Sequence, residues 1–358
     1  YYSTSSGAAY NVYVSSYTTL PETLVIPDKM AGSYPVKGIR GSSTSLTSGN
    51  TNRYNILNTT SENTTVKSII LPEMLTSIGV NTFANFKGLT SIVIPDTVTS
   101  IGAYAFYYCS ELKEVTLPLS ASLYTYSSSS YSYLPRASFY QCNKIAKMNF
   151  TKGTATSIPD YNLTTIDYLP WNSNTTAMEI ILPEGITSIG AYAFSYISEM
   201  DTFTIPDSVT NISSNAFLYS DMKKIKMSKN ITTIAQSAFK NCKFEELELP
   251  DTVTSIGKEA FSGCSNWKSE NFKLPENLTQ LNENVFYGCK NLTGTLEIPS
   301  KFNTIPSSCF YGTGFSNIVL PDTITTIKNS AFQKCTNLES IDFPKNLETI
   351  GNNAFSNC

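Results

Sequence analysis

The sequence predicts a solenoid of mixed α/β class, in which short repeating coils stack on one another. Two observations predict it: one phrase of 22 residues returns along the chain, and each copy contains an alternating apolar run that ends at a proline. The phrase SIVIPDTVTSIGAYAFYYCSEL occupies Ser91–Leu112, and close copies begin at Glu179 and Glu246. Such self-similarity is typical of repeat proteins, in which each unit buries its apolar edge only against its neighbours.

Each repeat has a constant arm and a variable arm. The constant arm runs from the proline to a phenylalanine eleven residues later, as from Pro95 to Phe106 or from Pro250 to Phe261. From the phenylalanine to the next proline the gap varies from 11 to 14 residues. One arm of the coil is therefore predicted to be rigid and the other adjustable.

Within a coil, the residues before the proline predict a strand. Ile92, Val93 and Ile94 alternate between inward and outward positions, which is the period of a β-strand. Proline ends the strand because it lacks the N–H that the ladder needs, and Pro-Asp or Pro-Glu then forms a turn. A second extended piece follows at 98–101, and the alanine–phenylalanine segment at 105–106 is predicted to form a short helical or 3₁₀ turn.

The repeat pattern I/L-P-D-x-V/I-T-x-I-G-x-x-A-F-x-x-C-x-x-L resembles the BspA-type leucine-rich repeat. The resemblance covers roughly Leu24 to Cys358, which is almost the whole chain. It implies a curved leucine-rich-repeat solenoid on a secreted or surface-attached protein that adheres to host or microbial partners. We expect a right-handed solenoid of about thirteen coils, with a parallel sheet on the concave face and short turns outside.

The repeats divide the chain into a cap and a repeat region. Residues 1–23 carry no repeat and are expected to form an N-terminal cap, since solenoids cover their first coil. Repeats then occupy 24–358, beginning with a divergent copy at Leu24–Arg40. Two insertions interrupt them, near 122–133 and 159–176, and regular coils continue to the end at Cys358.

Composition argues against several classes of function. The net charge of −3 without a basic stripe argues against nucleic acid, and no apolar run is long enough for membrane insertion. Histidine is absent and only three arginines occur, so we expect no catalytic residue, metal site or cofactor. No signal peptide opens the chain, and we expect the mature form of an extracellular or cell-surface protein.

The cysteines share one slot of the repeat, three residues after the phenylalanine. Because cysteine packs as a small hydrophobe, and one slot per coil gives no C-x-x-C spacing, we expect a buried column of reduced thiols. Disulfides or a metal cluster are the alternative. The slot contains Cys109, Cys142, Cys242, Cys264, Cys289, Cys335 and Cys358, while Cys309 takes the alanine slot.

The outward residues of the strands form a second column, and its two halves differ. In the C-terminal half the signs of the side-chain charges alternate from coil to coil, which predicts a ladder of ion pairs between neighbouring coils. In the N-terminal half apolar groups face outward, and both insertions add aromatic residues of the kind found in interaction sites. The full column is Ile70, Val93, Thr116, Asn149, Ile181, Thr204, Lys226, Glu248, Lys273, Glu297, Val319 and Asp342. The candidate ligand-binding residues are Ile70, Val93, Thr116, Ile181, Thr204, Tyr124, Tyr126, Tyr131, Tyr133, Tyr161, Tyr168 and Trp171.

Three functions remain open from the sequence. The first is a non-enzymatic adhesion or recognition scaffold that binds a host or microbial surface or matrix protein, or a glycan. The second is a structural surface protein that associates with itself end to end, since the chain stops at Cys358 without a polar cap. The third is a polysaccharide-active enzyme, which would use the carboxylates after the prolines. We expect those carboxylates to be turn residues instead, because the turn requires a polar side chain there. They are Glu73, Asp96, Glu184, Asp207, Asp251, Glu276 and Asp322.

Overall fold

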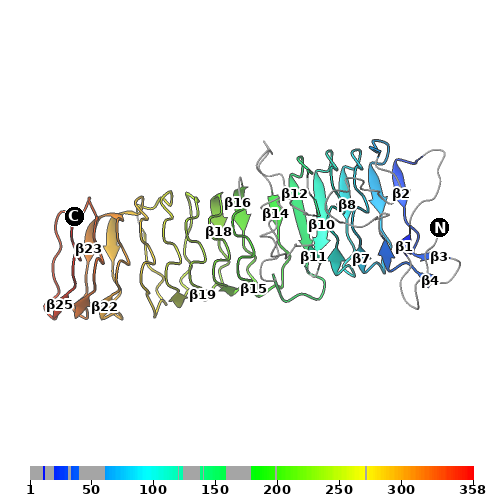
Figure 1. Cartoon of the computed structure of the whole chain (residues 1–358). Coiled ribbons are helices and arrows are strands. Elements are labelled where there is room, and N and C mark those ends of the chain that lie inside the picture. Colours follow the sequence, from blue (N-terminus) through cyan, green and yellow to red (C-terminus); the bar gives the residue numbers. More distant parts are fainter. Residues whose placement is uncertain are drawn as a thin grey trace, which may run out of the picture. The chain divides into compact units, whose positions relative to one another are not determined.

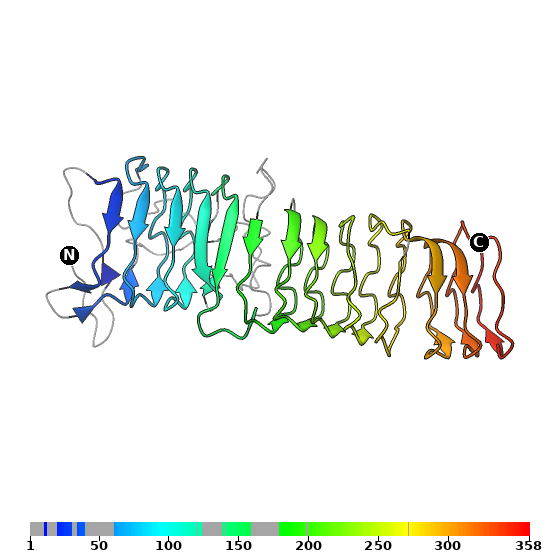
Figure 2. The same ribbon diagram turned by 180° about the vertical axis from the view of Figure 1, so that it is seen from behind.

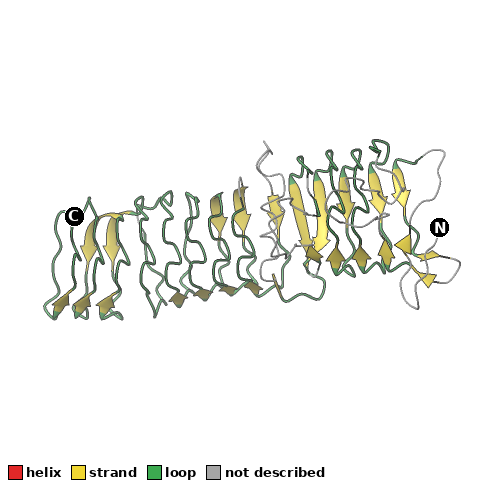
Figure 3. Cartoon of the chain, in the orientation of Figure 1, coloured by secondary structure: helices red, strands yellow, loops and turns green. Residues whose placement is uncertain are grey.

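The structure, a computed structural model, describes residues 11–12, 20–30, 34–39, 61–119, 121–123, 138–139, 141–158, 179–197, 200–270 and 272–358. The chain forms two compact units. Unit 1 is Tyr1–Ala155 with Thr165–Pro183, and unit 2 is Thr156–Thr164 with Glu184–Cys358. The described residues form strands, turns and loops and no helix (Figure 3). Each unit has the parallel-strand coils of a leucine-rich-repeat solenoid.

Unit 1 has two rows of strands, one mostly longer and one of two-residue strands (Figure 1). Every pair in these rows is parallel, and an antiparallel pair of β3 with β4 lies outside them. The first row is β2 (Thr23–Val25) beside β6 (Ser68–Ile70), and β8 (Ser91–Val93), β10 (Glu114–Pro118), β12 (Lys147–Thr151) and β14 (Glu179–Ile181) in that order. The second row is β1 (Asn11–Val12), β5 (Gly38–Ile39), β7 (Ser77–Ile78), β9 (Ser100–Ile101) and β11 (Ser122–Leu123). The antiparallel pair is β3 (Lys29–Met30) and β4 (Tyr34–Pro35).

Unit 2 repeats this arrangement, and the view from behind shows its two rows clearly (Figure 2). Its longer strands occur in two separate pairs, and in the two coils between them the described residues form no strand before the proline. The longer strands are β16 (Met200–Thr204) with β18 (Met222–Lys226), and β21 (Thr293–Glu297) with β23 (Gly314–Val319). The short ones are β13 (Ser157–Ile158), β15 (Ser188–Ile189), β17 (Asn211–Ile212), β19 (Thr233–Ile234) and β20 (Ser255–Ile256), then β22 (Thr304–Ile305), β24 (Thr326–Ile327) and β25 (Thr349–Ile350).

The alanine–phenylalanine segment forms tight turns, not the predicted helical or 3₁₀ turn. In the coil of Phe106, Tyr104 and Tyr108 take φ of 56° and 61°. Two left-handed residues so close together prevent the run of equal angles that a helix requires. Backbone hydrogen bonds then run between coils, as where the Phe217 amide donates to the Ala238 carbonyl at 2.7 Å.

The phenylalanines of the repeat form the core. In unit 2 consecutive rings lie 5.0 to 5.9 Å apart with interplanar angles of 15° or less, so they form one continuous stack. Each ring buries its faces against the coil before and the coil after. The stack contains Phe194, Phe217, Phe239, Phe261, Phe286, Phe310, Phe332 and Phe355.

The cysteine column lies beside this core. All eight thiols are free; seven are buried, as predicted, and Cys358 is exposed. Each thiol of the shared slot donates to a phenylalanine carbonyl one coil earlier: Cys264 Sγ lies 2.9 Å from the Phe239 oxygen. Ser220 takes the same slot and donates its hydroxyl in the same way. In these coils the slot therefore contains a small side chain with a donor, whereas buried Ile197 and Phe86 fill it in two others.

Candidate functional site

The strand register of unit 1 places the outward residues in the predicted order. Thr116 lies opposite Val93 on one side and Asn149 on the other, and Asn149 lies opposite Ile181. Val25, which the sequence analysis omitted, precedes the column as the partner of Ile70. It could have been found from the strand pattern TLVIP at residues 23–27, which matches the other repeats.

Three apolar side chains stand exposed on neighbouring strands. The exposed fractions are 59% for Val25, 54% for Ile70 and 64% for Val93. Two residues earlier on the same strands stand Thr23, Ser68 and Ser91, which carry no charge. These six residues form one uncharged surface, which we name the neutral patch.

Charges border the neutral patch on the side of β10. Glu114 pairs with Lys147 at 3.7 Å and accepts a hydrogen bond from Asn149 Nδ2 at 2.7 Å. Ile181 is 38% exposed but lies three strands from Val93, beyond Thr116 and Asn149. The register therefore separates Ile181 from the apolar part of the predicted site, whereas Thr116 borders that part beside Val93.

The remaining predicted residues do not join the neutral patch in the described part of the chain. Thr204 lies in unit 2, where it pairs with Lys226. The aromatic candidates of the two insertions lie outside the described residues. They are Tyr124, Tyr126, Tyr131, Tyr133, Tyr161, Tyr168 and Trp171.

The predicted charge ladder of unit 2 is wrong. Within the described residues, none of Lys226, Glu248, Lys273 and Glu297 forms a direct ion pair. For Lys226 and Glu248 the physical reason is that the pairing of the two coils ends two residues earlier, at the bridge of Lys224 with Glu246. Ion pairs form at that earlier level instead, as between Lys224 and Glu246, which are also the residues of the isolated bridge.

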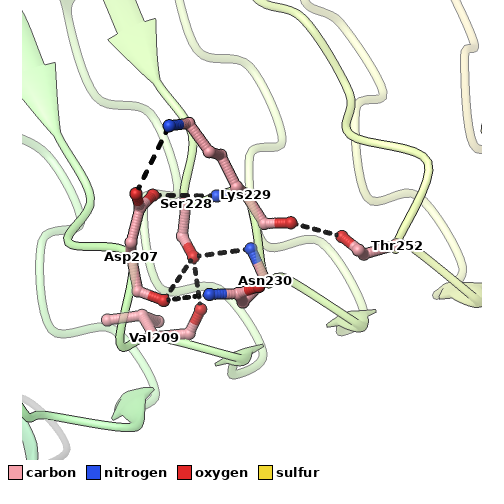
Figure 4. Close-up of polar contacts among 6 residues, drawn as sticks. All are labelled: Asp207, Val209, Ser228, Lys229, Asn230 and Thr252. Carbon is pink, nitrogen blue, oxygen red and sulfur yellow. Dashed lines mark hydrogen bonds and ion pairs between the residues drawn. The ribbon is translucent and has the colours of Figure 1, made fainter.

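The carboxylates after the prolines connect neighbouring coils, which supports their assignment as turn residues. Figure 4 shows one such turn: Asp207 Oδ1 accepts the Lys229 amide at 3.0 Å, and Asn230 Nδ2 donates to the Asp207 carbonyl at 2.8 Å. In another coil Asp251 Oδ1 accepts the Glu276 amide, also at 3.0 Å. These bonds hold one turn against the next.

The described residues form no helix with the length and hydrophobicity of a membrane span.

Comparison with known proteins identifies one family. The model of the BspA type leucine-rich repeat region matches six copies, over residues 54–164, 154–268 and 265–358. No curated protein matches the sequence. Among solved structures, leucine-rich repeat proteins from Bacteroides ovatus and Eubacterium ventriosum and a leucine rich cell surface protein from Faecalibacterium prausnitzii are similar, each at 22% identity. The match with the Bacteroides ovatus protein covers 100% of this chain and 90% of that chain, with a TM-score of 0.47. The match with the Eubacterium ventriosum protein covers 94% and 88%, with a TM-score of 0.44. The match with the Faecalibacterium prausnitzii protein covers 99% and 83%, with a TM-score of 0.40.

Proposed function

This chain belongs to the family of BspA type leucine-rich repeat proteins, and we propose that it is a non-enzymatic recognition scaffold. Its neutral patch binds another protein, and its location is outside the cell or at the cell surface. The partner is a surface or matrix protein of a host or of a neighbouring microbe. The observation that carries the proposal is the row of exposed apolar side chains at Val25, Ile70 and Val93.

The energetics of the patch support a protein partner. Each of the three side chains is more than half exposed, so covering it contributes about 1 kcal/mol. Because the side chains stand on paired strands, little conformational entropy is lost on binding. The patch carries no charge that a partner would have to desolvate, and apolar, charge-poor surfaces form the centres of protein interfaces.

Two aspartates in the patch test this function. The double variant Ile70→Asp/Val93→Asp should bind immobilised extracellular matrix proteins at least tenfold more weakly than the unmodified chain, because about 1.4 kcal/mol corresponds to tenfold. The melting temperature should barely change, since both side chains already face water. Binding is measured by biolayer interferometry over a panel of such proteins.

Ile181→Asp is the matched control, because it also adds a charge to an exposed apolar position of the same row. It should bind as the unmodified chain does. Unchanged binding of the double variant would contradict the proposal. Light scattering over a range of protein concentrations distinguishes self-association from binding to a partner. If the particle size grows with concentration, and the double variant abolishes that growth, the protein is a structural surface protein.

A further inference from the structure

Two exposed tyrosines lie side by side in the turns of unit 2. Tyr196 and Tyr219 occupy the same slot of neighbouring coils, two residues after Phe194 and Phe217. Their rings stack with centroids 5.4 Å apart and an interplanar angle of 13°. Tyr196 is 47% exposed and Tyr219 is 50% exposed. The pair belongs to unit 2, whereas the neutral patch belongs to unit 1.

The backbone of this slot does not favour tyrosine. Tyr196 and Tyr219 have φ of 59° and 57°, in the left-handed region that glycine and asparagine adopt at the lowest cost. The next coils of unit 2 have Asn241, Gly263 and Gly288 in the slot, also with positive φ. The backbone therefore gives no reason for two tyrosines here, and unfavourable positions of this kind cluster at ligand-binding sites.

Backbone hydrogen bonds hold both tyrosines in place. The Tyr196 amide donates to the Leu218 carbonyl at 2.7 Å, and the Tyr219 amide donates to the Lys240 carbonyl at 2.9 Å. Each ring is also stacked on one face by the other ring. Because the rings are already ordered, they lose little conformational entropy when a ligand covers them.

Other tyrosines of the turns have a lysine over the ring. Lys87 Nζ lies 4.5 Å from the centroid of the Tyr108 ring, and Lys334 Nζ lies 5.4 Å from that of Tyr311. Tyr311 also stacks on Tyr287, with centroids 4.3 Å apart, so this second stacked pair has a cation of its own. A cation within about 6 Å of a ring centroid is attracted by the negative face of the ring.

The first stacked pair lacks such a cation. Among the described residues, no lysine or arginine lies over either of its rings. In the coil after Tyr219, Lys240 pairs at 2.5 Å with Glu259, which lies one coil further on. Asn241 Oδ1 occupies the space where a side chain of Gly263 would begin. Both side chains therefore lean away from Tyr219, which agrees with its exposure.

We propose that the Tyr196–Tyr219 pair binds an arginine side chain of a partner protein, with the guanidinium over an outer ring face. The arginine would complete here the arrangement that lysines make at Tyr108 and Tyr311. Arginine suits the site because its planar guanidinium stacks on aromatic faces and is less strongly hydrated than an ammonium. The net charge of −3 also favours the approach of a basic segment.

The binding test uses the whole chain and a fluorescent peptide of alternating glycine and arginine, measured by fluorescence anisotropy. In a second peptide citrulline replaces each arginine, which keeps the shape of the side chain and removes its charge. We expect saturable binding of the first peptide and at least fivefold weaker binding of the second. Absence of binding by the first peptide, or equal affinity of the two, would overturn the proposal.

Variants distinguish a ring face from attraction by net charge, which none of them changes. Tyr196→Leu/Tyr219→Leu keeps apolar side chains but removes both rings, and it should weaken binding about fivefold, equivalent to roughly 1 kcal/mol. Tyr196→Phe/Tyr219→Phe keeps both rings and should bind as the unmodified chain does. If the phenylalanine variant binds as weakly as the leucine variant, the hydroxyl groups and not the ring faces bind the peptide, and the proposal is wrong.

Tyr287→Leu/Tyr311→Leu is the matched control, because it removes a stacked pair that already has Lys334 over one ring. It should leave peptide binding unchanged. If it weakens binding as much as the change at Tyr196 and Tyr219 does, the open pair is not the site. Melting curves of all variants check that each is folded, and the citrulline peptide on the unmodified chain needs no variant.

Discussion

Replacing Cys264 by valine should destabilise unit 2, whereas replacing it by serine should have a much smaller effect. Cys264 is fully buried, and its thiol donates to the Phe239 carbonyl of the preceding coil at 2.9 Å. The same carbonyl also accepts the Cys242 amide at 3.2 Å. Valine removes one of the two donors to this oxygen, while serine keeps both.

The magnitude follows from these contacts. A buried acceptor that loses a hydrogen bond costs about 1 to 2 kcal/mol, and the branched valine adds some strain in a close-packed column. Serine is smaller and less apolar than cysteine but is a stronger donor, so we expect a loss of about 1 kcal/mol or less. Ser220 already fills this slot in another coil and donates in the same way.

Urea denaturation followed by circular dichroism measures the difference. The valine variant should unfold at clearly lower urea than the serine variant, with the unmodified chain closest to serine. A valine variant as stable as the unmodified chain, combined with a less stable serine variant, would show that the column requires apolar volume and not a donor.

Three further outcomes follow from the same packing. Burial raises the pKa of Cys335 to about 11 from 9.0, so the folded thiol stays protonated at pH values where the unfolded thiol ionises. The contribution of this thiol to the free energy of unfolding is complete below pH 9 and falls by about 1 kcal/mol at pH 10. Cys335→Ser should reduce this loss in denaturation curves measured from pH 7 to 10. Thr252→Val removes a hydroxyl that donates to the Lys229 carbonyl at 2.9 Å and should cost about 1 kcal/mol in urea denaturation. Phe239→Leu should cost about 2 kcal/mol, because it leaves a gap in the stack beside Phe261; a change below 0.5 kcal/mol, which is about the uncertainty of such a measurement, would contradict the role of the stack.

The repeat could be predicted from sequence because its signals are local and recur. The spacing from proline to phenylalanine, as from Pro250 to Phe261, identifies the coil, and alternation before the proline identifies the strand and its outward residue. Register within unit 1 follows from these alone, since equivalent residues of successive coils pair. Burial of the cysteines also follows from their shared slot.

The errors concern what neighbouring coils do to one another. Alternating signs at Lys226 and Glu248 suggested contact, but contact depends on whether the two coils stay in register at that level. The pairing of these two coils ends at the bridge of Lys224 with Glu246, and a one-letter pattern does not contain the level at which pairing ends. The turns were mistaken for helical ones because left-handed angles at residues such as Tyr104 have no strict sequence signature outside glycine and asparagine.

The stack of phenylalanine rings has a mechanical consequence. Each ring of unit 2 contacts only the coil before and the coil after, so a pulling force on one end loads a single interface at a time. Consecutive rings such as Phe217 and Phe239 are 22 residues apart in sequence and 5.0 Å apart in space. Detaching one coil would therefore release roughly 70 Å of extended chain. Under tension unit 2 would lengthen in a series of small steps and dissipate energy at each one.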